Sequence, residues 1–333
     1  MAPLMTLLSL SAAFSSLASS RTIVSQPNGP LGVSLVNMQL VDSSRRDPYS
    51  NASERVLPIS IISPIGPSAS CDQVVQPYMD DTTASYWEKA FTSLYDLSIS
   101  LNVDIPGQDN IVTYADGSVQ YGNSNIVTDA QLTSAVGVRV QDLDFVFKSL
   151  SLPSKDLAVG NYLNLATSSA GIFGHSLGGA AALSAIINDK RFLGGADFDG
   201  GFDGSPSTVQ TNKPFLIFAS ADHNQSNVPS WPIVWQNLDG WKLQLQLNNS
   251  AHGTFFDLPI LVELYGIDNI PGAMQGLASV LGTINGTKAM DSIVRVTRAF
   301  FQFIFSHGKI DGRSVIDVAK GLEDIIISNG TGV

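Results

Sequence analysis

The most informative run of residues in this chain is Gly171-Ile172-Phe173-Gly174-His175-Ser176-Leu177-Gly178-Gly179-Ala180. Its apolar start favours a strand, and the alanine-rich segment that follows, Ala180–Ile187, has high helix propensity. A side chain at Gly174 or Gly178 is expected to collide with the neighbouring strand or helix, and glycine also tolerates unusual backbone angles. The sequence therefore predicts a strand, a sharp turn that carries a serine, and a helix.

This strand–turn–helix is the setting that a G-x-S-x-G nucleophile elbow requires. The serine hydroxyl would stand exposed above the sheet edge, and the first helix amides, that of Leu177 included, would point at a reacting carbonyl oxygen. The helix dipole favours negative charge at the same place. A chance match in a chain with 29 glycines, that is, a purely structural turn, is the alternative. The flanking strand and helix favour the elbow.

Composition indicates a folded globular chain. Apolar residues make up 44% and charged residues 14% of the 333 residues, which is enough for a sizeable core. The net charge of -11 argues against nucleic acid as a partner, while leaving open a transient contact with a lipid interface through an apolar patch. No His, Cys and acidic residues show the spacing of metal ligands, so neither a metal nor a cofactor is expected.

The N-terminal segment, residues 1–20, predicts a secretory signal peptide, and residues 21–333 are then expected to form a single domain. The segment is apolar and rich in small residues but too short to span a bilayer, and it lacks a basic start. Cys71 is the only cysteine, which excludes an internal disulfide. Five sequons suit a secreted glycoprotein: Asn51, Asn224, Asn248, Asn285 and Asn329.

Segments typical of strands and helices alternate along the chain. The expected strands are Leu31–Val41, Val56–Ser63, Leu97–Val103, Phe192–Phe198, Pro214–Ala219 and Trp241–Leu247. The expected helices are Thr83–Leu94, Ser134–Leu150, Leu258–Ile267 and Ala289–Phe305, with a polar turn at Asp42–Tyr49 and a long loop at Asp104–Asn125. This alternation predicts an α/β fold with a mostly parallel sheet and helices on both faces.

A serine nucleophile needs a base nearby, and the chain offers four histidines. His175 adjoins Ser176 in sequence, so its side chain should point away from the serine. His307 follows the terminal helix, and His223 sits just past a core strand. His252 lies on a loop after the last expected strand, where α/β-hydrolases place their histidine, and it is the candidate base.

The third member of such a site is an acid that orients the imidazole and stabilises its charged form. Asp199 follows the strand after the elbow helix, and Asp222 follows the next strand. Both positions can reach the histidine loop in this architecture. Spacing alone leaves the two aspartates as alternatives.

With these residues in place, the chain resembles the platelet-activating-factor acetylhydrolase family, especially its secreted fungal members, from about Leu31 to Phe305. The resemblance implies an α/β-hydrolase fold and hydrolysis of short-chain esters, such as the acetyl ester of an ether phospholipid. It also implies an acid in an aspartate-glycine setting, which favours Asp199 over Asp222. The matching motifs are Asp42–Tyr49 with Arg55–Pro64, Pro77–Met79, Asp104–Gly122, Arg139–Asp142 with Phe145 and Val146, and Gly282–Ile284 with Ala289–Asp291.

One family segment is missing from this chain. Family members carry a strand ending in Ser-His-Gly or Ser-Pro-Gly and then a helix before the loop matched by Asp104, and this segment supplies the second oxyanion-hole amide. Here Leu97–Val103 leads directly into Asp104, without the roughly 30 residues of a strand–helix unit. The sequence thus predicts a fold that lacks one central unit. Ser63-Pro64-Ile65-Gly66 is the candidate substitute, with the Gly66 amide as donor, and Cys71 would have lost its partner.

The expected function is that of a secreted serine esterase acting on a small-molecule or phospholipid ester. Ser176 would attack the ester, His252 would take its proton, Asp199 would orient His252, and the Leu177 amide would bind the oxyanion. An inactive hydrolase-fold binding protein, or a lipase or peptidase on the same scaffold, are the alternatives. Core packing is the expected role of Trp231, Trp235 and Trp241, and lining of the acyl or alcohol pocket is the alternative. The sequence specifies neither the natural ester nor an oligomeric state.

Overall fold

The structure is a computed structural model that describes residues 32–50, 54–65, 105–109, 111–123, 126, 128–151, 168–202 and 205–331. The chain divides into two compact units, one from residues 1–125 and 145–165, the other from residues 126–144 and 166–333. The expected signal peptide of residues 1–20, the helix Thr83–Leu94, the strand Leu97–Val103, and Cys71 all lie outside the described residues.

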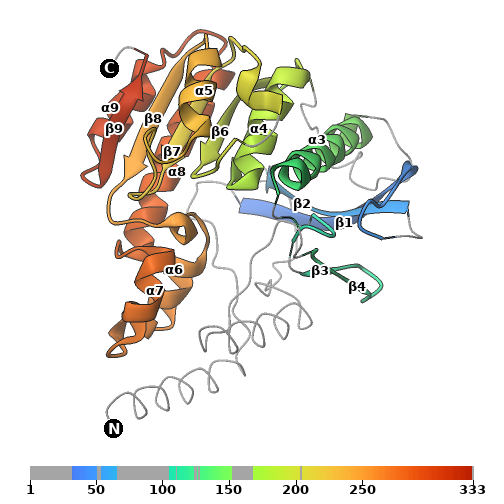
Figure 1. Cartoon of the computed structure of the whole chain (residues 1–333), viewed down its shortest axis with the longest axis horizontal. Coiled ribbons are helices and arrows are strands. Elements are labelled where there is room, and N and C mark those ends of the chain that lie inside the picture. The colour runs from blue at the N-terminus through green and yellow to red at the C-terminus, as the bar shows by residue number, and fades with distance from the viewer. Residues whose placement is uncertain are drawn as a thin grey trace. The chain divides into compact units, whose positions relative to one another are not determined.

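The second unit is built on a five-stranded sheet with the order β5-β6-β7-β8-β9 (Figure 1). Strands β5 to β8 run parallel, and β9 pairs antiparallel with β8. The mostly parallel sheet predicted from the sequence is therefore confirmed. The strand bounds are β5 (Ala170–His175), β6 (Phe192–Phe198), β7 (Phe215–Ala219), β8 (Lys242–Leu247) and β9 (Ile325–Gly330).

Helices cover both faces of this sheet because its central strands are apolar on both sides. In β7, Leu216 and Phe218 face one layer, while Phe215, Ile217 and Ala219 face the other, and all five are fully buried. Burial of each large side chain contributes about 1.5–3 kcal/mol. The two cores thus hold the sheet in a fixed position under the loops at its carboxyl edge.

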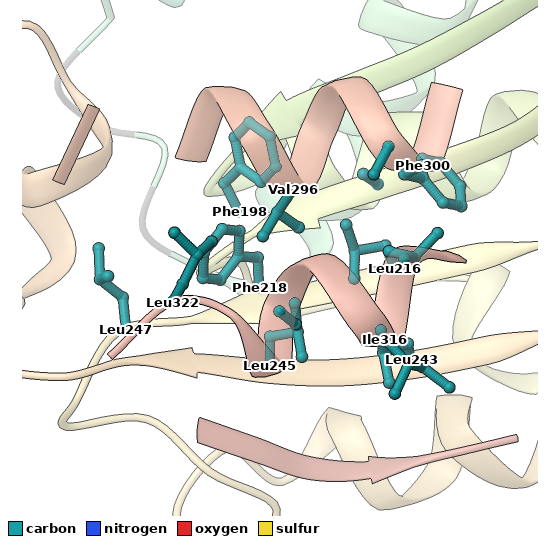
Figure 2. Close-up of a cluster of buried hydrophobic side chains, with 14 of the residues drawn as sticks. Phe198, Leu216, Phe218, Leu243, Leu245, Leu247, Val296, Phe300, Ile316 and Leu322 are labelled. Atoms are coloured by element: carbon teal, nitrogen blue, oxygen red, sulfur yellow. The ribbon is translucent and has the colours of Figure 1, made fainter. Parts of the chain in front are cut away.

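The first core lies between the sheet and two helices, α8 (Gly286–Phe305) and α9 (Arg313–Lys320). Figure 2 shows strand residues Leu216, Phe218 and Leu245 pointing toward the helix residues of this cluster, including Val296 and Phe300. The second core holds α4 (Leu177–Asn188), α5 (Ser230–Asn237) and the part of α3 (Asp129–Ser151) that belongs to this unit.

Two predicted helices begin earlier in the structure than the sequence analysis expects. Helix α3 starts at Asp129 rather than Ser134, because Thr128 and Gln131 form a reciprocal capping box, with bonds of 3.0 and 3.3 Å. Helix α8 starts at Gly286, where the Asn285 side chain accepts a hydrogen bond from the Lys288 amide at 3.0 Å. Both starts follow from polar caps that lie outside the apolar stripes.

The carboxyl edge of the sheet carries short helical elements (Figure 1). They are η2 (Ser205–Thr208), η3 (His252–Phe255), α6 (Leu258–Leu264), η4 (Ile267–Asn269) and α7 (Ala273–Leu281). Helix α6 lies inside the predicted helix Leu258–Ile267 and is largely buried, so this segment is core. No helix among the described residues is long and apolar enough to cross a membrane.

The first unit contains two antiparallel pairs, β1 (Gly32–Arg46) with β2 (Glu54–Ile65), and β3 (Ile111–Thr113) with β4 (Val119–Tyr121). Three expectations are wrong here. The turn predicted at Asp42–Tyr49 begins only after Arg46, Pro64 does not end β2, and the loop predicted at Asp104–Asn125 contains the β3–β4 hairpin. Proline is tolerated in β2 because an edge strand leaves N–H positions without a partner.

A buried ion pair fixes the start of the first unit. The Arg55 guanidinium is fully buried and lies 3.0 Å from the Asp47 carboxylate, and it also donates to the Pro106 carbonyl at 2.8 Å. The guanidinium thereby joins the two neighbouring motifs around Asp47 and Arg55 to the segment around Pro106, which lies 51 residues after Arg55. Removal of one partner of such a pair costs about 3–5 kcal/mol, because the other charge stays buried.

The elbow strand β5 is hydrogen-bonded to β6 on one side, and no other described strand pairs with it. Ser63, Pro64 and Ile65, the first three residues of the predicted substitute for the missing oxyanion segment, form the end of β2. Gly66 itself lies outside the described residues. The absence of one central strand–helix unit therefore stays a prediction.

Candidate active site

Ser176 lies in a strained turn between β5 and α4. Its φ is 56° and its ψ is -124°, a combination that non-glycine residues rarely adopt and that clusters at functional sites. A Cβ at Gly174 would overlap the backbone of Gly178, as the sequence predicts. The prediction for Gly178 is wrong, because a Cβ there meets open space. Gly179 is the second crowded position, since a Cβ there would overlap the Asp197 carboxylate.

His252 is the first residue of the turn η3, which follows β8. Thr254 holds this turn: its hydroxyl accepts from the Ala251 amide at 2.8 Å and donates to the Leu281 carbonyl at 2.7 Å. His252 Nδ1 lies 2.8 Å from Asp199 Oδ2, and its side chain is 44% exposed. Since a carboxylate only accepts, Nδ1 carries the proton and Nε2 is left as the basic nitrogen.

Asp199 is a fully buried carboxylate at the end of β6, held at a positive φ of 60°. The Ser220 amide donates to its Oδ1 at 2.6 Å, while Oδ2 receives the bond from His252. Burial by itself raises the pKa of Asp199, but the hydrogen bonds from His252 and Ser220 and the nearby His223 outweigh burial and bring the pKa below 3.8. The group is therefore an anion at neutral pH.

Asp222, the alternative acid, is exposed at the end of β7. Its backbone carbonyl accepts a hydrogen bond from the Asn227 side chain at 2.6 Å. Within the described part of the chain, no hydrogen bond or ion pair joins its carboxylate to His252. The structure thus brings Asp199, and not Asp222, to the histidine.

His175, directly before the serine, contacts the histidine turn. Its Nε2 lies 3.0 Å from the His252 carbonyl oxygen, and the two rings are 4.4 Å apart. Burial, followed by the nearby His252 ring, lowers the pKa of His175 to about 4. His175 is consequently neutral at physiological pH, and because a carbonyl only accepts, its Nε2 carries the proton.

Asp197 is a second buried carboxyl group below the elbow, and its environment differs from that of Asp199. The Gly200 amide donates to its two oxygens at 3.0 and 3.1 Å, and no cation balances its charge among the described residues. Burial, with a smaller contribution from the charge of Asp199, raises the pKa of Asp197 well above 3.8. The carboxyl group that packs against Gly179 of the elbow therefore resists ionisation.

Replacement of Asp197 by asparagine is expected to change how stability depends on pH. Because the native pKa is raised, the native state holds a proton that the unfolded state loses above pH 3.8, so wild-type stability falls as pH rises through this window. Each unit of elevation corresponds to about 1.4 kcal/mol. Denaturant unfolding from pH 4 to 8 should show Asp197→Asn gaining stability relative to wild type as pH rises. Parallel curves would contradict the assignment.

His223 is a neighbour of Asp199 that the sequence analysis places only beyond a core strand. Its Nδ1 lies 2.9 Å from Asp199 Oδ1, yet this buried nitrogen has no aligned hydrogen bond among the described residues. The side chain is 36% exposed, and its ring meets Trp231 edge-on at 6.3 Å. Its position at the carboxyl end of β7, next to the end of β6, is the signal that could have indicated this contact.

The other residues singled out from the sequence are Leu177, the candidate oxyanion donor, and three tryptophans. Leu177 is the first residue of α4, so its amide has no acceptor one turn earlier in the helix, whereas the Gly179 amide donates to the Ser176 carbonyl at 2.9 Å. Core packing is confirmed for the tryptophans: Trp231 is fully buried and donates to the Gly200 carbonyl at 2.7 Å. Trp235 packs against the second core, and Trp241 stacks on Phe300 at 5.8 Å.

Comparison with known proteins finds similarity in both sequence and fold. Residues 159–315 match the family model described as platelet-activating factor acetylhydrolase, isoform II. A curated relative from Arthroderma benhamiae, named a probable 1-alkyl-2-acetylglycerophosphocholine esterase, is 26% identical over 223 residues. The match covers 64% of this chain and 54% of the relative, so the chain spans about half the length of that protein.

The fold is also found among solved structures. A ferulic acid esterase from Streptomyces cinnamoneus superposes with a TM-score of 0.64 over 92% of this chain and 99% of the other, at 20% sequence identity. The protein therefore has an α/β-hydrolase fold. Over residues 159–315, the segment that carries Ser176, Asp199 and His252, it resembles the platelet-activating-factor acetylhydrolase family.

Proposed function

We propose that this protein is a serine carboxylic-ester hydrolase with Ser176 as nucleophile, His252 as base and Asp199 as acid. The observation that carries the proposal is the 2.8 Å hydrogen bond from His252 to the buried Asp199, at the same sheet edge as the strained serine turn. A buried carboxylate that holds one imidazole nitrogen leaves the other nitrogen as a base of fixed orientation.

In the acylation half of the reaction, Ser176 Oγ attacks the ester carbonyl carbon while its proton passes to His252 Nε2. The imidazolium that forms is stabilised by the Asp199 anion. The oxyanion of the tetrahedral intermediate accepts a hydrogen bond from the Leu177 amide at the start of α4. Collapse of the intermediate expels the alcohol, which takes the proton from His252.

In the second half of the reaction, water replaces the alcohol. His252 Nε2 takes a proton from the water as its oxygen attacks the acyl carbon, and it returns the proton to Ser176 Oγ as the acyl group leaves. His175 supports both halves, because its bond to the His252 carbonyl fixes the histidine turn. No step of this proposal uses a cofactor.

The proposed substrates are short-chain acyl esters, including phospholipid esters. The name of the curated relative, a 1-alkyl-2-acetylglycerophosphocholine esterase, supports this class. The signal-peptide prediction for residues 1–20 supports a secreted glycoprotein, whose contact with a lipid interface would be transient. The Gly66 amide is proposed as the second oxyanion donor.

A substrate series tests the proposal. Purified protein is incubated with the p-nitrophenyl esters of acetate and palmitate and with acetyl p-nitroanilide, and separately with a fluorophosphonate probe. We expect rapid labelling of Ser176 and fastest turnover of the acetyl ester. Preference for palmitate would identify a lipase, and turnover of the anilide a peptidase. Folded protein that neither labels nor hydrolyses would be a binding protein, which would overturn the proposal.

A further inference from the structure

Three side chains at the carboxyl edge of the sheet could together bind a metal ion: Asp199, His223 and His252. One donor atom of each side chain lies within 4.8 Å of a donor atom of the other two. The two histidines approach opposite oxygens of one carboxylate, His223 Nδ1 at 2.9 Å from Oδ1 and His252 Nδ1 at 2.8 Å from Oδ2. Two imidazoles and a carboxylate are a donor set used by divalent transition metals.

The environment of His223 points to a ligand. Its Nδ1 is buried and lacks an aligned hydrogen bond among the described residues, although it lies beside a carboxylate oxygen. A buried polar atom without a partner is rare and needs an explanation. In the tautomer with its proton on Nε2, the ring presents the Nδ1 lone pair to Asp199, and a cation between the two groups would be bound by both.

We propose that Asp199, His223 and His252 form an inhibitory binding site for a divalent zinc-type ion. Donor atoms around a tetrahedral zinc ion lie about 3.3 Å apart, between the 2.8 Å and 4.8 Å separations in this cluster. Small side-chain rotations therefore suffice. The imidazoles are 36% and 44% exposed, so an ion can enter from solvent, and water would complete the coordination.

Binding of the ion would switch off the base by moving one proton. In the resting state the neutral imidazole of His252 carries its proton on Nδ1, which donates to Asp199. When zinc takes the Nδ1 lone pair, that proton moves to Nε2 and the ring remains neutral. Nε2 then has no lone pair to accept the Ser176 proton. This consequence rests on the proposed esterase function, whereas binding of the ion does not.

The test separates binding from catalysis. Calorimetric titration with zinc chloride is carried out on wild type, Ser176→Ala and His223→Phe, the last of which keeps an aromatic ring against Trp231. We expect equal affinity in wild type and Ser176→Ala. In His223→Phe we expect zinc affinity to fall by more than about a hundredfold. Removal of a residue that only supports a ligand, without binding the metal itself, costs roughly tenfold to hundredfold in affinity. His307→Asn, at the exposed end of α8, is the matched control and should bind as wild type does.

Ester hydrolysis supplies the second measurement. At a zinc concentration ten times its Kd, wild-type activity should fall roughly tenfold and return when EDTA is added. Magnesium should have no effect, since it prefers oxygen ligands. The activity of His223→Phe, compared with its own rate without zinc, should not fall when zinc is added. If that variant fails to fold, His223→Gln replaces it. Zinc affinity unchanged by loss of His223, or no binding to wild type, would overturn the proposal.

Discussion

Replacement of Ser176 by alanine is expected to lower kcat for a short-chain aryl ester by on the order of 10⁴- to 10⁶-fold, because the acyl-enzyme can no longer form. The residual rate would come from the Leu177 amide and substrate binding. Alanine has the same difficulty as serine with the φ of 56°, so the turn and the melting temperature should change little. Steady-state kinetics with active-site titration measures the effect.

A control on the same helix makes this measurement specific. Ser184→Ala is the identical substitution within α4, at a buried position away from the turn, and it should retain activity close to wild type. Labelling by a fluorophosphonate should disappear only in Ser176→Ala. Hydrolysis that survives in that variant at near wild-type rates would place the nucleophile elsewhere in the chain.

Replacement of Asp199 by asparagine carries the second large effect, a loss of about 10⁴-fold in kcat. The amide keeps the shape of the carboxylate but can donate a hydrogen bond to His252 Nδ1. The imidazole then carries its proton on Nε2 and cannot accept the serine proton. The amide also has no charge with which to stabilise an imidazolium. The reaction should keep its KM and lose kcat.

Asp222→Asn is the matched control, because it makes the same chemical change at the other candidate acid. Its carboxylate is exposed and has no bond to His252 among the described residues, so activity should stay within about twofold of wild type. Because the pKa of Asp199 lies below 3.8, wild-type Asp199 stays an anion throughout the neutral range in which the two variants are compared. A larger loss in Asp222→Asn than in Asp199→Asn would reverse the assignment.

The elements around the candidate site could be predicted because their signals are local. β6 has the predicted bounds, and β7 and β8 each begin one residue later. The unbroken apolar run of β7 and the alternation of Leu and Gln in β8 can both be read from neighbouring residues. Strand β9 is not predicted from the sequence. It is short, half-exposed and antiparallel at the sheet edge, and its pairing with β8 joins segments about 80 residues apart.

Local sequence patterns predict the elbow at Ser176, the strand after which Asp199 lies and the loop that carries His252. Glycine spacing, apolar runs and chain order are properties of neighbouring residues. Packing between separate segments makes Gly179 rather than Gly178 the crowded glycine and brings His223 to the Asp199 carboxylate. It also gives Asp197 and Asp199, two residues apart, pKa values shifted in opposite directions. These features depend on which groups from separate strands meet at one edge, because burial and hydrogen-bond partners are set by packing.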